Sequence, residues 1–503
     1  MNYFLRPLLG CTALFCLTAL VRGEDFYVAQ TALKSDTGAD AANAHSRAWF
    51  ENSANWGAGA GKISPGDTVH LVGTLTGLSA QGSGAAGNPI TILFEPGAKL
   101  SSPNTDLMYV GGLSYLVIDG GTNGIIENTA NGTALANHTP GVKGINVTGC
   151  SNITIKNLTI RNLYVHTSVN DSALDFTTGG GVYANGYGAG MVIQNCSFSD
   201  ICWCVIMFGS PTGNLTVANC NFVNYDHGIG GVAGTSGPVT GFTATGNHFG
   251  STVNWDTTAN SYHHDGIHTF WGNGGALPNA VITNNLFDGD WGTHNTAHLF
   301  FEQNYNTHSP AEASGWIIAN NVHIQYPSNY LNNGFMVAIG NNATIANNTY
   351  IGSSVALSQA LSVTGTGAVF ENNLIVGVNR FVDAASPFAV INNNIYASVV
   401  GSGNTPFRFK GSDVASFAAW KSATGGESAS QMLSSIAINN DGTLPSGSAA
   451  IDAGTTVAAS LATDRLGASR LQGNAWDVGA YEFSSGGTSI VPPSNAKVSI
   501  TVP

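Results

Sequence analysis

Short runs of alternating apolar and polar residues, each ending in one or two asparagines, recur along the middle of the chain. Between about residues 154 and 396, successive runs lie 21 to 38 residues apart, and the shorter steps measure 21 to 27 residues. The alternation has the period of a β-strand and lacks the period of a helix. A strand-like repeat of this length is typical of a parallel β-solenoid with one coil per repeat. The first asparagines of the motifs are Asn157, Asn195, Asn219, Asn284, Asn320, Asn347, Asn372 and Asn393.

Asparagine at the same place in every repeat has a structural explanation. Stacked coils place equivalent residues about 4.8 Å apart, so asparagine side chains can hydrogen-bond to one another along the stack. We therefore predict a structural asparagine ladder and assign it no catalytic role. By the same spacing, Cys196 and Cys220 fall on one position of adjacent coils, where they form either a disulfide or a stacked pair of thiols.

Composition and charge exclude several classes of protein. The 503 residues include 16 Lys and Arg against 29 Asp and Glu, which gives a formal net charge of −13. This charge argues against nucleic acid or an anionic membrane surface as the partner. No segment after the N-terminus reaches the roughly 18 apolar residues of a membrane-spanning helix. We expect a monomer that binds no nucleic acid and does not span a membrane.

The N-terminus resembles a secretory signal. Residues 1–23 contain one early cation, Arg6, then an apolar run and small residues before Glu24, which fits a cleavage site. We therefore expect a secreted protein, either extracellular or periplasmic. The expected parts of the chain are a signal peptide (1–23), an N-terminal cap with the first coils (24–110), a β-helix carrying the site (111–400), a closing segment (401–483) and a flexible tail (484–503).

Two terminal stretches resemble a known group of proteins. Residues 64–71 and 87–92 look like the opening coil of β-helix polysaccharide lyases, and residues 450–454 and 477–482 are similar to the closing segment of secreted bacterial β-helix proteins. The chain thus resembles right-handed parallel β-helix proteins of the pectin-lyase-like superfamily, of the polysaccharide lyase or glycoside hydrolase type. The resemblance implies an all-β, right-handed parallel β-helix of about ten coils with an N-terminal cap and an irregular C-terminal segment.

Histidines and acids gather where the strands of successive coils are aligned. Residues 225–229 align with residues 264–268 and then with residues 294–298. Strand alternation directs Ile267 and Ala297 inward, leaves the direction of Asp265 open and puts Asp226 beside the outward row. The side chains expected to point outward together are His264, His268, His294, His298 and Glu302, with Tyr183 one coil earlier on the same face.

The same coils carry the longest insertions, near residues 161–180, 248–263 and 302–315. Such loops would wall a groove, in which aromatic side chains stack on sugars and polar ones bind hydroxyl groups. A polar stacking ladder and ordinary loop packing are the alternative explanations. The expected substrate-binding residues are His227, His294, Asn295, Trp271, Trp291 and Tyr262.

The distribution of basic residues bears on whether the chain acts as a lyase or as a hydrolase. No Lys or Arg occurs from Asn162 to Asn379, so the Lys and Arg roles of many β-helix lyases cannot be transferred to this chain. Hydrolysis of a neutral glycan needs only an acid and a carboxylate. Residues 265–268 also look like the Asp-Gly-Ile-His portion of polygalacturonase-type hydrolases, in which that Asp is catalytic. The later motifs of that family are missing here, and Asn295 stands where its second Asp is expected.

Three hypotheses follow. In the first, Asp265, Asp226 and Glu302 share the acid and base roles of a glycoside hydrolase, and the histidines orient sugar hydroxyls. In the second, a β-eliminating lyase or C5-epimerase acts on a uronate polymer, with His264 or His268 as base and Tyr183 as acid. A divalent cation such as Ca²⁺, held by Asp226 and His264, would neutralise the uronate; the first hypothesis requires no cofactor. In the third, the chain is a non-catalytic glycan-binding or surface solenoid.

Overall fold

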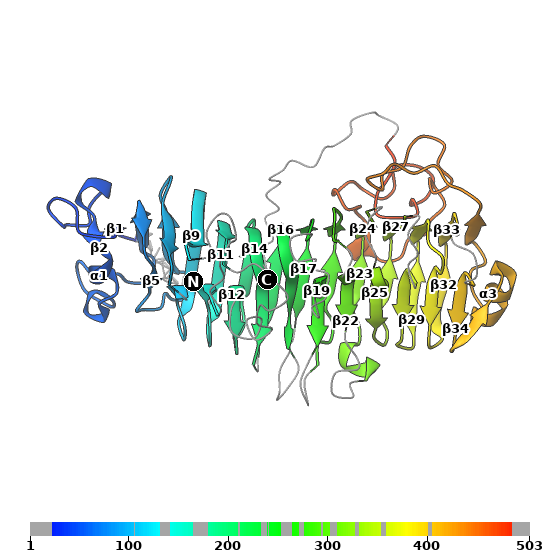
Figure 1. Ribbon diagram of the computed structural model, residues 1–503, viewed down its shortest axis with the longest axis horizontal. Coiled ribbons are helices and arrows are strands. Elements are labelled where there is room, and N and C mark those ends of the chain that lie inside the picture. The colour runs from blue at the N-terminus through cyan, green and yellow to red at the C-terminus, as the bar shows by residue number, and fades with distance from the viewer. Residues whose placement is uncertain are drawn as a thin grey trace, which may run out of the picture.

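Three parallel sheets run along the long axis of the molecule, and the coils of the chain contribute strands to each of them in turn (Figure 1). The computed structural model describes residues 23–104, 106–130, 141–163, 180–209, 212–232, 239, 241–252, 264–270, 276–292, 295–301, 309–326, 331–353, 359–400 and 405–484. Long strands that bend take part in two sheets. They are β9 (Ser114–Asn128), β11 (Ser151–Arg161), β14 (Ser197–Phe208) and β16 (Asn221–Val232).

Sheet 1 contains the strands that precede the asparagine motifs. Apart from the first parts of β9 and β11, its strands in stacking order are β1 (Asp25–Ala29), β3 (Thr68–Val72), β6 (Ile90–Phe94), β13 (Met191–Gln194), β15 (Leu215–Ala218), β17 (Phe242–Thr245), β20 (Val281–Thr283), β23 (Ile317–Ala319), β26 (Thr344–Ala346), β29 (Ala368–Glu371) and β32 (Phe388–Asn392).

Sheet 2 follows the asparagine motifs. It contains the second parts of β9 and β11, the first parts of β14 and β16, and the strands β4 (Thr74–Leu75), β7 (Lys99–Ser102), β18 (His248–Phe249), β21 (Leu286–Phe287), β24 (Val322–Ile324), β27 (Thr349–Ile351), β30 (Leu374–Val376), β33 (Ile395–Ala397) and β36 (Gln431–Leu433).

Sheet 3 completes each coil. It contains the second parts of β14 and β16 and the strands β5 (Leu78–Ser79), β8 (Asp106–Tyr109), β10 (Lys143–Asn146), β12 (Gly180–Asn185), β19 (His264–Phe270), β22 (Asn295–Phe301), β25 (Leu331–Ile339), β28 (Leu361–Val363), β31 (Val382–Ala384) and β34 (Phe407–Phe409).

This architecture confirms the parallel β-helix predicted from the repeat. The inward side chains of the sheets form one contiguous hydrophobic core, from Phe26 near the N-terminal end to Trp420 near the C-terminal end. Coils also form ahead of the first asparagine motif, over β1 to β9, so the stack is longer than the expected ten coils.

Short elements close both ends of the stack. At the N-terminal end, β2 (His45–Ser46) pairs with β1, and η1 (Ala41–Asn43), α1 (Arg47–Phe50) and η2 (Ser53–Asn55) lie beside it. Within the Ala-rich stretch 38–50, only these short helices and β2 form. At the other end, β35 (Ser412–Val414) pairs antiparallel with β34, and α3 (Phe417–Thr424) packs Trp420 on Phe407 (Figure 1). The remaining short helices are η4 (Pro310–Ala313) and η5 (Ala459–Leu461).

The asparagines have two separate structural roles. In the motifs that have one, the second asparagine is buried and takes part in a ladder of hydrogen bonds between coils, as Asn321 does with Asn348 at 3.1 Å. The first asparagine adopts the left-handed backbone conformation, for example Asn347 at φ +55°, which asparagine tolerates better than most residues. The predicted ladder is thus confirmed. It joins Asn247, Asn285, Asn321, Asn348, Asn373 and Asn394.

The repeat also predicted correctly that Cys196 and Cys220 occupy equivalent positions of adjacent coils. Cys196 and Cys220 follow paired positions of β13 and β15, and both are buried free thiols. Of the two alternatives, the structure has the stacked thiol pair and not the disulfide. Burial, followed by the contact with Cys196, raises the pKa of the Cys220 thiol well above its usual range, so this thiol is protonated at neutral pH.

Candidate functional site

Two adjacent strands of sheet 3, β16 and β19, bring two aspartates and two histidines together. Strand pairing places His227 beside Asp265 and Gly230 beside His268. Nδ1 of His227 lies 2.8 Å from Oδ2 of Asp226, and its Nε2 lies 2.9 Å from Nδ1 of His268. Oδ2 of Asp265 lies 3.5 Å from Nε2 of His227 and 3.5 Å from Nδ1 of His268. We call Asp226, His227, Asp265 and His268 the acid–histidine cluster.

The cluster is almost completely buried, since none of its members is more than 4% exposed. Burial alone lowers the pKa of His227, but the carboxylates of Asp226 and Asp265 outweigh burial and raise that pKa to about 9. An imidazolium donates at both ring nitrogens. His227 therefore donates from Nδ1 to Asp226 and from Nε2 to Nδ1 of His268. A neutral His268 then carries its own proton on Nε2.

Aromatic rings fix the planes of both histidines. The Trp203 ring stacks on His227 with centroids 4.0 Å apart, His227 stacks on His268 at 5.0 Å, and Phe300 covers His268 at 4.8 Å. Trp203 is buried but lies outside the contiguous hydrophobic core, so this row of rings follows the other side of sheet 3. Phe300 is only partly buried and marks the point at which the row approaches solvent.

Glycines and a local irregularity direct the cluster to this side of the sheet. A Cβ on Gly266 would lie 2.7 Å from the Phe287 ring, so the position after Asp265 faces the core. Ile267 is also fully buried in the core. Asp265 and His268 are therefore separated by two inward positions and lie on the same side, which strict alternation does not predict. On β16, Gly230 makes room for Trp203, whose ring would lie 2.8 Å from a Cβ there.

His298 was predicted to point outward, and this prediction was wrong. The pairing of β19 with β22 shifts between His264 and Asp265, so Ala297 lies beside Asp265 and Phe300 beside His268. His298 instead enters the core, where its ring stacks on Phe287 and His323, each at a centroid distance of 5.5 Å. Burial lowers the pKa of His298 to about 3, so its imidazole is neutral in the folded protein.

Two further predicted residues lie away from the cluster. Trp291 is fully buried, packs edge-on against Tyr225 and donates from Nε1 to the Asp288 carbonyl at 2.7 Å, so its faces are not available for sugar stacking. Tyr183 lies on the row of His268, but three strand steps earlier instead of one coil. Three steps correspond to about 14 Å, and the Lys143 ammonium lies over the Tyr183 ring at 5.2 Å.

Several predicted residues fall outside what the structure describes. Tyr262, Trp271, His294 and Glu302 lie outside the described residues, as do the side chains of His264 and Asn295. Their proposed roles stay predictions. Within the described residues, sequence reasoning missed Trp203, because its place beside His227 follows only from the pairing of β14 with β16.

Donor atoms for a metal ion are present in the same place. Among the described residues, one group offers three such atoms within 4.8 Å of one another, and it consists of His227, Asp265 and His268. This set differs from the expected pair of Asp226 and His264. The Asp226 carboxylate faces the other nitrogen of His227.

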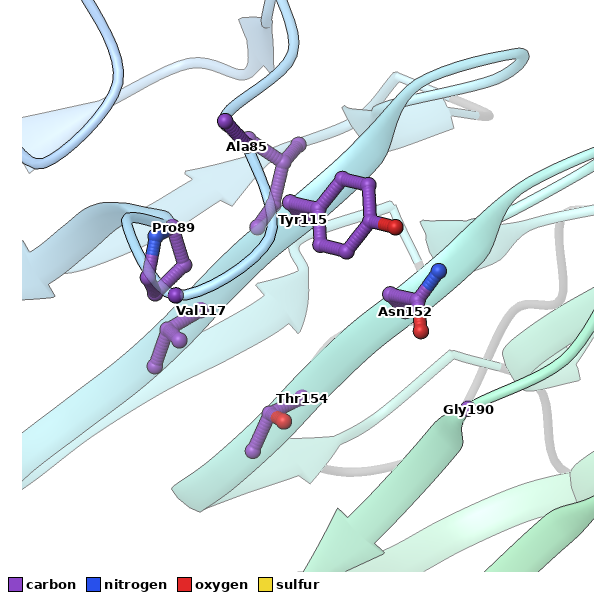
Figure 2. Close-up of a pocket in the computed structure, with 9 residues that line it drawn as sticks. Ala85, Pro89, Tyr115, Val117, Asn152, Thr154 and Gly190 are labelled. Atoms are coloured by element: carbon purple, nitrogen blue, oxygen red, sulfur yellow. The ribbon is translucent and has the colours of Figure 1, made fainter.

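A separate hollow of about 250 Å³ opens on sheet 1 near the N-terminal end. Figure 2 shows Tyr115 and Val117 of β9 facing Asn152 and Thr154 of β11 across it, with Pro89 at its edge. Its lining contains neither a carboxylate nor an imidazole, so it lacks the groups of acid–base catalysis. The acid–histidine cluster, on another sheet, is the better candidate site.

Comparison with known proteins places the chain by its fold alone. No family model matches the sequence, and no curated protein is similar to it. A GH136 lacto-N-biosidase from Eubacterium ramulus is similar in structure, with a TM-score of 0.44, 13% identity and coverage of 78% of this chain and 66% of the enzyme. The pectate lyase Pel9A has a TM-score of 0.41, 15% identity and coverage of 91% and 96%. The PL6 family alginate lyase AlyGC has a TM-score of 0.38, 12% identity and coverage of 75% and 52%.

The parallel strand pairing of the chain itself gives it the β-helix expected from its resemblance to the pectin-lyase-like superfamily. It spans about two thirds of the length of the lacto-N-biosidase and about half that of the alginate lyase. Within the described part of the chain, no helix is long and apolar enough to cross a membrane.

Proposed function

We propose that this chain is a polysaccharide-degrading enzyme that hydrolyses glycosidic bonds of a neutral glycan at the acid–histidine cluster. The observation that carries the proposal is the contact of two buried carboxylates, Asp226 and Asp265, with one imidazole that in turn contacts His268. Buried acids in contact with histidines are costly to maintain for stability alone. Such groups are typical of catalytic sites.

The four side chains have different roles in this mechanism. Hydrolysis needs one group that protonates the leaving oxygen and one that activates water. His268, next to the partly buried Phe300, gives its Nε2 proton to the leaving glycosidic oxygen. Asp265 takes a proton from the water whose oxygen attacks the anomeric carbon. As His268 loses this proton, its Nδ1 takes the proton that His227 donates between the two rings. Asp265 then releases its proton to solvent, Nε2 of His268 takes one up from solvent and the shared proton moves back to His227, so the net reaction adds one water molecule and restores the site.

Asp226 and His227 act as positioning residues. Asp226 holds Nδ1 of His227, and Nε2 of His227 holds Nδ1 of His268, so the relay sets the ring orientation and the tautomer of His268. Asp265 is also held from its other side, because its Oδ1 accepts from the Ala297 backbone N–H at 2.9 Å. The proton-transfer groups are therefore fixed on strands of the sheet before substrate binds, as efficient catalysis requires.

The local charge favours a neutral substrate. The cluster sets two carboxyl groups, Asp226 and Asp265, against one imidazolium, His227, while the sequence from 162 to 379 contains no Lys or Arg to attract a uronate. A polyanionic chain would meet repulsion in a site of low dielectric constant, where like charges interact strongly. A glycan without carboxylates avoids this cost.

A second candidate is β-elimination or C5-epimerisation of a uronate polymer. The contact between His227 and His268 supports it, because an imidazole in such a pair can abstract a C5 proton. Tyr183 does not complete this mechanism as first expected, since about 14 Å of stacked strands separates it from His268. The elimination mechanism would need another acid in place of Tyr183.

A screen of neutral and acidic polysaccharides with mass spectrometry of the products tests the proposal. Hydrolysis predicts new reducing ends and products that each carry one added water. Unsaturated products that absorb in the ultraviolet would replace the proposal with the elimination mechanism. Intact polymers in every case would favour the non-catalytic binding solenoid. Asp288→Asn is the matched control for Asp265→Asn, because Asp288 also contacts a histidine, His248, outside the cluster.

A further inference from the structure

We propose that His227, Asp265 and His268 form a binding site for a divalent transition-metal ion of the zinc class. The ligand atoms are Nε2 of His227, Nδ1 of His268 and Oδ2 of Asp265. This inference goes beyond the proposed hydrolysis and does not depend on it, because it rests on the arrangement of the three donor atoms.

The triangle of donor atoms has the size of one face of a tetrahedral site. Its sides are 2.9 Å between the two nitrogens and 3.5 Å from each nitrogen to the Asp265 oxygen. With metal–ligand bonds of about 2.0–2.1 Å, neighbouring ligands of a tetrahedral ion lie roughly 3.3 Å apart. For an ion to replace the proton that the two rings share, the His227–His268 contact has to lengthen by about 0.4 Å and both rings have to tilt so that their nitrogens point at the ion.

The chain holds all three ligands in place before an ion arrives. His227 lies on β16, Asp265 and His268 lie on β19, and the two strands are paired in register at these positions. The Trp203 and Phe300 rings stack on the two imidazoles and restrict their rotation. A rigid and largely buried frame of this kind reduces the entropy lost when a ligand binds.

Asp226 supplies the partner that metal-binding histidines usually have. Its Oδ2 lies 2.8 Å from Nδ1 of His227, the nitrogen that does not face the proposed ion. A carboxylate in this place holds the proton on Nδ1, so that Nε2 can bind metal once it gives up the proton it donates to His268, and it makes the imidazole a stronger ligand. The two carboxylates, Asp226 and Asp265, also balance the charge of a divalent ion in a buried site.

The donor types select the class of ion. Two imidazole nitrogens and one carboxylate suit Zn²⁺, Co²⁺ or Fe²⁺, whereas Ca²⁺ and Mg²⁺ prefer sites built from oxygen. An ion held at Nδ1 of His268 and Oδ2 of Asp265 occupies the oxygen that acts as base in the proposed hydrolysis, so the metal-bound form is separate from the hydrolysing form. The ion class therefore differs from the calcium expected from sequence.

Another histidine–acid group in the chain provides a matched control. Nδ1 of His70 lies 2.6 Å from Glu95, and its Nε2 lies 3.2 Å from Asp25. The two acids therefore sit on opposite nitrogens of a single ring and cannot enclose one ion. His70→Gln should leave metal binding unchanged.

The test is a metal titration of the full chain purified without a polyhistidine tag and stripped with a chelator. Co²⁺ is added first, because tetrahedral Co²⁺ gives intense visible absorption, and Zn²⁺ is then added in competition. We expect one ion per chain, displacement of Co²⁺ by Zn²⁺, and loss of the signal in His227→Gln and His268→Gln. Asp226→Asn should weaken binding by roughly 10- to 100-fold while the stoichiometry stays at one.

Two results would overturn the proposal: no stoichiometric uptake by the wild-type chain, or uptake that persists in both histidine variants. Circular dichroism checks that the variants are folded, and Asp226→Asn, which removes no ligand, serves if they are not. A rise in the melting temperature of the wild-type chain on adding Zn²⁺ gives an independent readout. The titration contains no polysaccharide. Failure to bind metal would therefore leave the proposed hydrolysis untouched, and failure to hydrolyse would leave the proposed metal site untouched.

Discussion

Nε2 of His227 lies 2.9 Å from Nδ1 of His268, although 41 residues separate them in the chain. The contact exists because β16 and β19 pair in register. His227 lies beside Asp265, and His268 lies three residues further along β19. Asp226 and Asp265 approach the same imidazole from its two nitrogens. The stacking of the coils therefore brings into one hydrogen-bonded relay side chains that lie far apart in the sequence.

The first prediction concerns Asp265→Asn. The amide keeps the shape of the carboxylate and the hydrogen bond from the Ala297 N–H to Oδ1, but it cannot take a proton from water. We expect kcat to fall by at least about 100-fold, as for loss of a general base, with little change in the melting temperature. Turnover on the glycan identified in the screen measures the first effect and thermal unfolding the second.

Asp288→Asn is the control for this experiment, because Asp288 contacts His248 at 2.6 Å and lies outside the cluster. Its turnover should stay close to that of the wild-type chain. Undiminished turnover in Asp265→Asn would remove Asp265 from the mechanism. A large loss of stability would mean that its main role is structural.

The fold was predictable because its cause is local and repeated. Each first asparagine sets the same left-handed backbone turn, as at Asn347 and Asn372, and each second asparagine bonds to the next coil. The position of the site residues was less predictable. Gly266 and Ile267 both face the core, and the β19–β22 pairing shifts at Asp265. Strict alternation misses such an irregularity, and so His298 was placed on the wrong side.

The second prediction concerns the asparagine ladder. Asn321 donates to the Ile282 carbonyl at 2.8 Å and to Asn348 at 3.1 Å, and it accepts from the backbone N–H of Asn285 at 3.0 Å. Asn321→Leu removes these three hydrogen bonds. Asn348 Oδ1 keeps the backbone N–H of residue 321 as a donor, so two groups lose their bond to Asn321 without such a replacement, at a cost of about 1–3 kcal/mol each. We expect the free energy of unfolding, measured with urea, to fall by about 2–5 kcal/mol.

A first-position asparagine is the matched control for the ladder. Asn195 has φ +54° and is only partly buried, and glycine adopts this conformation without strain. Asn195→Gly should change the free energy of unfolding by less than about 0.5 kcal/mol. Equal losses from Asn195→Gly and Asn321→Leu would contradict the separate roles of the two asparagines.

The third prediction is an acid-sensitive stability that arises from the core histidines. Burial lowers the pKa of His298 to about 3 and that of His323 well below its usual value, against a small opposing effect of Asp265 on His298. Below about pH 6.5 the unfolded chain binds protons that the folded chain does not, so stability falls as the pH falls. Between about pH 7.5 and 5.5, each histidine should remove about 1.4 kcal/mol.

Urea unfolding at these two pH values measures the effect, and His323→Phe should reduce the pH dependence by about one histidine's share. Phenylalanine keeps the stacking with Phe287 and Tyr350. Phe287→Leu is the control, since it weakens the same core without removing a titratable group. An unchanged pH dependence in His323→Phe would show that its imidazole does not titrate on unfolding.

The fourth prediction concerns the segment that closes the molecule. Arg470 is fully buried, donates to Oδ1 of Asn320 at 2.6 Å and to the Gly479 carbonyl at 3.1 Å, and lies 3.5 Å from Glu482. Burial lowers the pKa of Arg470 to about 10, so the guanidinium stays charged at neutral pH. Burial raises the pKa of Glu482 to about 8, and this acid keeps the Asp477 backbone N–H as a donor. Arg470→Met therefore removes the donor to two acceptors, Asn320 Oδ1 and the Gly479 carbonyl, a loss of about 2–5 kcal/mol.

This loss should appear first as local opening, because the closing segment packs on the outside of the coils. Besides Arg470, the asparagines Asn320, Asn372 and Asn393 donate to carbonyls of this segment. We expect limited proteolysis of Arg470→Met to cleave within residues 441–484 while the coils stay intact. Arg465→Met is the control, since Arg465 is only partly buried and makes a single 3.3 Å contact with the Tyr481 hydroxyl. Equal proteolysis of the two variants would mean that the segment is held by its apolar contacts, with Leu444 and Val478 packed against Leu374, and not by Arg470.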